Sequence, residues 1–248
     1  MVGLAGPVRV RAQDVAADRS STKTTQAKIG YRSVMEKTRK FTRDLPEVRR
    51  RQLIDATLHC LAEFGHAGTS VRAVCARAGV SPGLVTHHFD GIDDLIAAAY
   101  AHVGDQVAGI LEAAMTAAGS DPLAQLRAFV DASFRPPVLD SDLLAVWLAF
   151  WSLVRRDPDI RRIHATIYGD YRRTLESLVD VITTARGLDL DIRLTALGFT
   201  AMMDGLWLEL CLDASSFTAE EALRIAHGWI DTLIEGQFSH LTRSAGQA

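Results

Sequence analysis

The chain has 248 residues, 48% of them hydrophobic, and a formal net charge of −3, which predicts a folded protein with one or two hydrophobic cores. Its longest apolar run, Leu143 to Trp151, is far shorter than the roughly 20 residues that cross a bilayer, so no membrane partner is expected. Three scattered cysteines argue against a disulfide framework, and Arg9 and Arg11 interrupt any signal-peptide core, so a cytoplasmic location is predicted.

Residues 1–45 form a basic extension, with ten Lys or Arg against four Asp or Glu. Polar residues dominate it and no apolar period is sustained, which predicts disorder. A basic segment on an acidic body is compatible with a polyanionic partner, and equally with a solvated tail that has none. Met35 precedes the basic stretch EKTRKFTR and is an alternative start, so the extension is given no function.

From Pro46 onward the pattern is helical. Apolar residues recur every three or four positions up to Phe64, and Gly65 suits the left-handed position at which helices end. Thr69 or Ser70 can cap the short helix that follows by accepting a bond from a backbone N–H. A turn then leads to a second short helix.

The rest of the chain alternates longer helices with breaks. Asp93 and Asp94 open a helix that is expected to end near Ala118. Further helix starts are marked by a cap followed by proline, or by a glutamate three residues later, and they stand at residues 121–122, 157–158 and 218–221. No strand-like alternation of useful length is present. We therefore predict an all-α protein with about nine helices.

The stretch ARAGVSPGLVTHHF has the features of a helix-turn-helix corner. Gly79 can take the positive φ that the turn requires, and Cys75, four positions earlier, is compact enough for the two helices to cross. Ser81 followed by Pro82 predicts a side-chain cap and a proline at the first position of the second helix. Gly83 leaves the helix tip bare, so its backbone N–H groups can approach a phosphate.

The second short helix is expected to present Thr86 and His87 on its outer face, where a major groove would meet them. Arginines of the flanking helices are candidates for contacts to the DNA backbone, namely Arg49, Arg50, Arg51, Arg72 and Arg77. A corner between two helices of an ordinary helical protein has the same pattern of glycine, cap and proline residues. The residues alone therefore leave both interpretations open.

The segment TSVRAVCARAGVSPGLVTHHFDGIDDL resembles the DNA-binding segment of the TetR family of one-component repressors, over about residues 47–107. The segments AVWLAFW and MMDGLWLELCLD resemble the regulatory domain of the BetI group, which responds to choline. The resemblance implies a homodimeric repressor that reads a palindromic operator in double-stranded DNA and is released by a small-molecule effector. It implies an N-terminal three-helix, helix-turn-helix domain at 46–107 and a C-terminal ligand-binding and dimerisation domain at 108–248.

The helix-turn-helix motif is assigned to Ser70 to Phe89. The residues predicted to contact DNA are Arg49, Thr69, Ser70, Val71, Ser81, Pro82, Gly83, Leu84, Thr86, His87 and His88.

Two positions depart from the family pattern. Thr86 stands where most members have tyrosine, although the BetI group has serine, and Ile92 stands where a phosphate-binding lysine is usual. Loss of that lysine is expected to weaken binding to the DNA backbone. Because the second helix lacks Arg, Asn and Gln, specificity is expected to depend on Thr86, His87, apolar contacts and DNA shape.

Aromatic residues on the C-terminal helices predict a ligand pocket. The predicted ligand-binding residues are Trp147, Trp151, Tyr168, Tyr171, Asp204 and Trp207. A quaternary ammonium such as choline would be attracted to the ring faces, aided by a carboxylate such as Asp204 or Glu209. Core packing of the aromatics, and an ion pair between Asp204 and an arginine, are the alternatives.

The last two helices, 191–212 and 218–235, are apolar on a broad face and are expected to form a four-helix bundle with those of a second subunit. Packing within one subunit is the alternative. No Gly-rich phosphate loop, nucleophile elbow or His-Glu-x-x-His motif is present, so an enzyme, a cofactor and a metal site are not expected. A dimeric ligand-binding scaffold without specific DNA recognition is the second functional alternative.

Overall fold

The computed structural model describes residues 46–238, so the predicted N-terminal extension lies outside the described residues. Within that range the chain forms nine helices and no strand, which confirms the all-α prediction. The helices are α1 (Pro46–Gly68), α2 (Val71–Ala78), α3 (Pro82–His88), α4 (Ile92–Ala117), α5 (Pro122–Ser133), α6 (Ser141–Leu153), α7 (Pro158–Arg186), α8 (Ile192–Leu212) and α9 (Ala219–Ile234).

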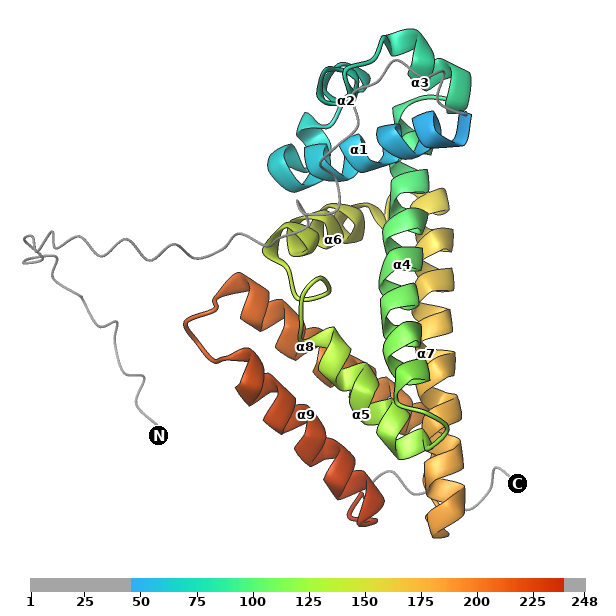
Figure 1. The fold of residues 1–248 in the computed structure, drawn as a ribbon, viewed down its shortest axis with the longest axis vertical. Helices are drawn as coiled ribbons and strands as arrows, with labels where there is room; N and C mark the ends of the chain where they lie inside the picture. Colours follow the sequence, from blue (N-terminus) through green and yellow to red (C-terminus); the bar gives the residue numbers. More distant parts are fainter. Residues whose placement is uncertain (1–45, 239–248) are drawn as a thin grey trace, which may run out of the picture.

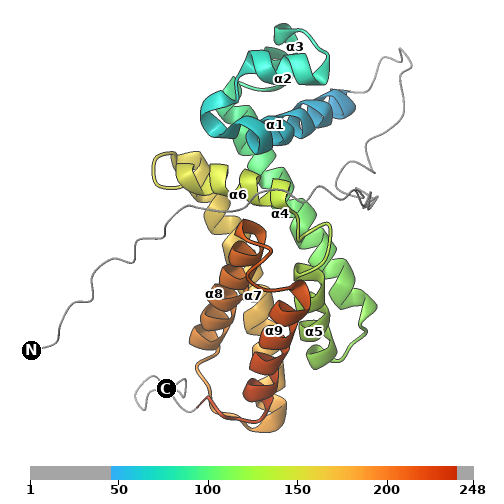
Figure 2. The same ribbon diagram turned by 90° about the vertical axis from the view of Figure 1, so that its left-hand side faces the viewer.

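Helices α1, α2 and α3 form a small unit at one end of the molecule, and α4 runs from it along the long axis beside α7 (Figure 1). Helices α5, α8 and α9 pack against the far part of this pair, and α8 and α9 lie side by side on one face (Figure 2). Because α4 is continuous, it joins the α1–α3 unit directly to the larger helical unit.

Most helix starts follow from local capping. The side chains of Asp121, Asp140 and Asp157 each accept bonds from two backbone N–H groups of the following helix, and Thr218 forms a reciprocal capping box with Glu221. The sequence expects a helix to end at Gly65. Gly65 takes a positive φ of 63° and breaks the helical geometry inside α1, and a short helical segment follows this kink as far as Gly68.

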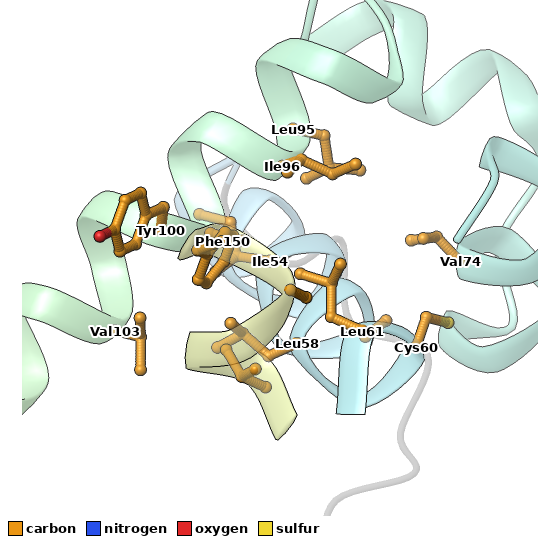
Figure 3. Packing of buried hydrophobic residues seen from close by; sticks show 14 of the residues in the cluster. Ile54, Leu58, Cys60, Leu61, Val74, Leu95, Ile96, Tyr100, Val103 and Phe150 are labelled. Atoms are coloured by element: carbon orange, nitrogen blue, oxygen red, sulfur yellow. The ribbon is translucent and has the colours of Figure 1, made fainter. Parts of the chain in front are cut away.

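The core of the α1–α3 unit is completed by α6, which is distant in sequence. Leu58 and Leu61 of α1 and Leu95 of α4 belong to the same buried cluster as Phe150 of α6 (Figure 3). The Phe150 ring stacks on that of Tyr100 with a centroid separation of 4.2 Å. The small N-terminal unit therefore shares its core with a helix of the larger unit.

Helices α4 and α7 are in close contact where Gly104 faces Ile167. A Cβ atom added at Gly104 would lie 2.5 Å from Cδ1 and 2.7 Å from Cγ1 of Ile167. The position of Cγ1 is set by χ1, which a β-branched residue in a helix holds in one rotamer. Only glycine at residue 104 therefore allows this crossing without displacing one of the two helices.

We expect Gly104→Ala to destabilise the protein by about 1–3 kcal/mol, because the added methyl overpacks the contact with Ile167. The better helix propensity of alanine offsets only about 1 kcal/mol of this cost. Gly109→Ala is the matched control on the same helix, since a Cβ there meets no atom within 4 Å. Thermal unfolding should show a lower Tm for the first variant and a higher Tm for the second; equal shifts would contradict the prediction.

Candidate DNA-binding surface and ligand pocket

The corner between α2 and α3 has the predicted backbone geometry. Gly79 takes a φ of 68°, in the left-handed region, and its N–H donates to the carbonyl of Cys75. The N–H of Val80 donates to the same carbonyl at 3.1 Å. Val85 is fully buried and attaches α3 to the core of the unit. These contacts fix the direction in which α3 leaves the turn.

The opposite side of α3 faces outward. Thr86 and His87 are exposed, as are Ser81, Pro82 and Gly83 at the start of the helix. The Thr86 hydroxyl donates to the carbonyl of Gly83 at 3.1 Å, so it must rotate away from the backbone before it can donate to a base. The outer face of α3 therefore carries small and polar groups, as a helix that enters the major groove of DNA does.

Two expected local roles are different in the structure. Thr69 is only 7% exposed and its hydroxyl donates to the carbonyl of Gly65 at 2.8 Å, so this side chain is turned into the protein and not toward the α3 surface. Ser70 alone caps α2, accepting a bond from the N–H of Ala73 at 3.3 Å. The Ser81 side chain makes no capping hydrogen bond, and α3 begins with Pro82 alone as its start signal.

The remaining predicted contact residues are divided between surface and core. Val71, Leu84 and His88 are half-buried, and the first two pack against the N-terminal core. Ile92, at the position where the family usually has lysine, packs against the same core. Leu84 and His88 thus present only part of their side chains to a partner, and residue 92 contributes stability to the unit.

Most of the candidate arginines already make contacts inside the unit. Arg77 pairs with Glu63, and the Arg50 guanidinium lies over the Phe89 ring at 5.0 Å from its centroid. Arg51 pairs with Asp55 at 3.2 Å. Arg49 donates to Gln52, and Arg72 is exposed on α2. Within the part of the chain that the structure describes, no ion pair is formed by Arg72, so its charge is available to a phosphate.

The larger unit contains a cavity of about 480 Å³ between α4, α5, α6, α7 and α8. The six residues predicted to bind a ligand line it, whereas Glu209, the other carboxylate considered, does not; the six are Trp147, Trp151, Tyr168, Tyr171, Asp204 and Trp207. A volume of this size is typical of small-molecule sites, which are mostly apolar and lie between helices.

Several of these aromatics also hold the helices together. The Trp207 indole donates to the carbonyl of Val138 at 3.1 Å, and the Tyr171 ring meets that of Phe129 edge to face at 5.1 Å. Trp147 is almost completely buried in the core that includes α6. These residues therefore pack in the core and line the cavity as well.

Asp204 is the most unusual residue of the cavity. Burial raises its pKa to about 6, and the Arg172 charge lowers it by less. Burial, followed by the Asp204 charge, raises the pKa of Tyr168 and Tyr171. Among the described residues no ion pair to Asp204 lies within 4.0 Å, so the expected arginine partner acts only from a distance. At neutral pH the cavity thus contains a carboxylate beside aromatic rings without a close counter-ion.

A search for similar proteins matches residues 53–99 to the bacterial regulatory proteins of the tetR family and residues 122–235 to the C-terminal domain of BetI-type transcriptional repressors. The BetI regulator of Burkholderia thailandensis is 35% identical over 189 residues, which are 76% of this chain and 94% of that protein. The chain belongs to the TetR family.

Solved structures of TetR-like proteins have the same architecture. A transcriptional regulator from Pseudomonas aeruginosa PAO1 is 41% identical and gives a TM-score of 0.76, covering 80% of this chain and 96% of its own. A regulator from Saccharomonospora viridis in complex with choline is 18% identical, with a TM-score of 0.67 over 80% of this chain and all of that one, and shows a shared fold. The names of these relatives confirm the prediction of a regulator rather than an enzyme.

The sequence did not identify the α4 wall of the pocket in this TetR-family chain. Seven residues of α4 line the cavity, among them Asp105, Glu112 and Met115. Their spacing along the helix places them on one face, but most of them are apolar, and an apolar face is also what a helix packed on an ordinary core presents. No group of three potential metal ligands is present among residues 46–238.

Proposed function

We propose that this TetR-family protein is a ligand-responsive repressor that binds a palindromic operator through α3. The observation that carries the proposal is the orientation of α3: Val85 is buried while Thr86 and His87 are exposed on the other side. An exposed helix tip with bare backbone N–H groups suits a phosphate, and the side chains beyond it suit a major groove. The protein would act in the cytoplasm, where the DNA is.

Homodimerisation through α8 and α9 is supported by their exposed apolar side chains. These include Leu194, Leu197 and Leu212 of α8 and Ile225 of α9, which lie on helices that are side by side (Figure 2). By length and its mean hydropathy of 1.2, α8 would also suffice to cross a membrane, but the core helix of a globular protein passes the same test. A second subunit would remove this apolar surface from water.

The effector is proposed to be an organic cation such as choline, bound in the cavity beside Asp204. The unpaired carboxylate and the faces of the Trp and Tyr rings both favour a cation. Release from DNA would then follow from the ligand's preference for one conformation of the dimer. Successive major grooves lie about 34 Å apart, and in the conformation that the ligand favours the two α3 helices do not match this spacing. A coupling of about 1–3 kcal/mol is the usual scale.

The double substitution Thr86→Ala and His87→Ala is expected to weaken specific operator binding by about 1–3 kcal/mol per half-site, because both side chains would lose contacts to base edges. Retardation of the DNA upstream of the protein's own coding region measures this, at several salt concentrations. Binding to unrelated DNA at low salt should change little, since phosphate contacts are kept. Unchanged operator affinity would mean that other residues read the sequence.

The same measurement separates the repressor from the alternative of a dimeric scaffold that does not recognise DNA. A repressor binds its upstream DNA more tightly than unrelated DNA, and the difference persists as salt is raised. A scaffold shows no retardation even at low salt.

A further inference from the structure

The cavity is larger than a small ammonium ion requires. It holds about 480 Å³. At about 30 Å³ per non-hydrogen atom, which is the share of a water molecule in the liquid, the roughly seven such atoms of choline need about 200 Å³. More than half of the cavity is therefore left for other ligand atoms.

Residues of the paired helices α4 and α7, which lie side by side (Figure 1), line the cavity over several turns. Its lining on α4 runs from Gly104 to Met115, which at 1.5 Å per residue is about 16 Å. Its lining on α7 runs from Thr166 to Thr174, or about 12 Å. A ligand that follows the two helices can thus be several methylene groups long.

The lining differs chemically along the cavity. Asp204, Tyr168 and Tyr171 line it together, and the Asp204 charge raises the pKa of both tyrosines. Tyr168 follows Ile167, which closes on Gly104, and the Tyr171 ring meets that of Phe129. The carboxylate therefore belongs to the aromatic part of the cavity. A compact ammonium group would find its counter-charge and aromatic faces there.

Farther along α4 the lining is mostly apolar. Leu111 and Met115 belong to, or pack against, the core cluster of the larger unit, and Glu112 is the charged residue between them. Methionine adapts its shape readily and is suited to contacts with alkyl chains of varied length. This part of the cavity would bury the uncharged part of a ligand.

The charges of the lining all have one sign. Its charged residues are Asp105, Glu112, Asp170 and Asp204, and none of the lining residues is Lys, Arg or His. An anionic ligand would enter without a counter-charge, which carries a large cost in a partly buried site.

We propose that the effector is an amphiphilic organic cation, with a compact ammonium group beside Asp204 and an apolar extension of several carbon atoms along α4 toward Met115. This proposal rests on the proposed effector-released repressor and names the class of its ligand. It assigns Met115 as a residue that sets the chain length the pocket accepts.

The test is calorimetric titration of the full-length protein with alkyltrimethylammonium ions, from tetramethylammonium to the octyl compound, below their micelle concentrations. Affinity is expected to rise about fourfold per added methylene, the increment for burying one such group. The 1-alkanols and alkanoates of matched length are the uncharged and anionic comparisons, and both should bind more weakly than the ammonium ion.

Met115→Trp should shorten the accepted chain, leaving tetramethylammonium unaffected and weakening the octyl ion about tenfold or more. Ala113→Trp adds the same group to an exposed position of α4 outside the cavity lining and should have no effect. The chain-length series on the unaltered protein is decisive even if the Met115 variant fails to fold.

The outcomes distinguish this inference from the proposed function. Tight binding of choline with no gain from longer chains would overturn the amphiphilic class and leave a cation-responsive repressor in place. Tighter binding of alkanoates than of ammonium ions would overturn the cation class itself. Failure of the repressor proposal would appear separately, as no operator binding by the ligand-free protein.

Discussion

The variant Leu197→Glu is expected to be monomeric and to bind a palindromic operator about 100-fold more weakly than the unaltered protein. Leu197 is 42% exposed in the isolated subunit, on the α8 face where the second subunit is proposed to pack. A carboxylate there would be buried without a partner in the dimer, at a cost of several kcal/mol. A monomer engages only one half-site and loses the gain from binding two at once.

Sedimentation measures the oligomeric state, and titration of labelled operator measures the affinity. Val181→Glu is the matched control, because Val181 is a similarly exposed apolar residue, 49% exposed, but on α7. That variant should remain dimeric and keep its operator affinity. A dimer formed by the Leu197 variant, with normal affinity, would place the subunit interface elsewhere.

The variant Asp204→Asn is expected to lose most of its response to a cationic effector while becoming more stable without ligand. Removal of the carboxylate takes away a charge-assisted contact worth about 1.5–3 kcal/mol, so cation affinity should fall roughly 10- to 100-fold. The raised pKa of Asp204 shows that burial disfavours its charged form. A neutral amide avoids that cost, so we expect a gain of about 2 kcal/mol at pH 7.5 and a Tm about 4–8 °C higher.

Titration with choline measures the expected loss of cation affinity, and thermal unfolding measures the expected rise in Tm. Glu209→Gln removes an exposed acid of the same helix that does not line the cavity, and it should change neither quantity. A lower Tm for Asp204→Asn would show that the carboxylate makes a stabilising contact. Undiminished cation binding would remove Asp204 from the site.

The same residue sets the sign of two pH dependences. The pKa of Asp204 is raised from 3.8 to about 6 by folding, so between these values the folded protein binds a proton that the unfolded chain does not. Its contribution to stability is therefore present at low pH and is lost as pH rises through about 6. Cation affinity should show the opposite trend, falling below about pH 6 as the carboxylate is protonated, and Asp204→Asn should remove this dependence.

Local interactions made the helices and the corner predictable from the sequence. The caps at Asp121, Asp157 and Thr218 and the turn at Gly79 involve partners two to four residues away, so their patterns are visible in a short stretch. The outward side of α3 followed from the same pattern, because Leu84 and Val85 are apolar whereas Thr86 and His87 are polar.

The sequence by itself determined the helices, the helix-turn-helix corner and the aromatic character of the pocket. Tertiary structure decided which aromatics line a cavity, that α6 completes the N-terminal core, and that Asp105, Glu112 and Asp170 lie around the same space as Asp204. The close contact of α4 with α7 at Gly104 likewise could not be predicted from the sequence. The physical reason is that caps and turns depend on neighbours in the chain, whereas a cavity is the space left when helices far apart in sequence pack, and no periodicity within one helix specifies it.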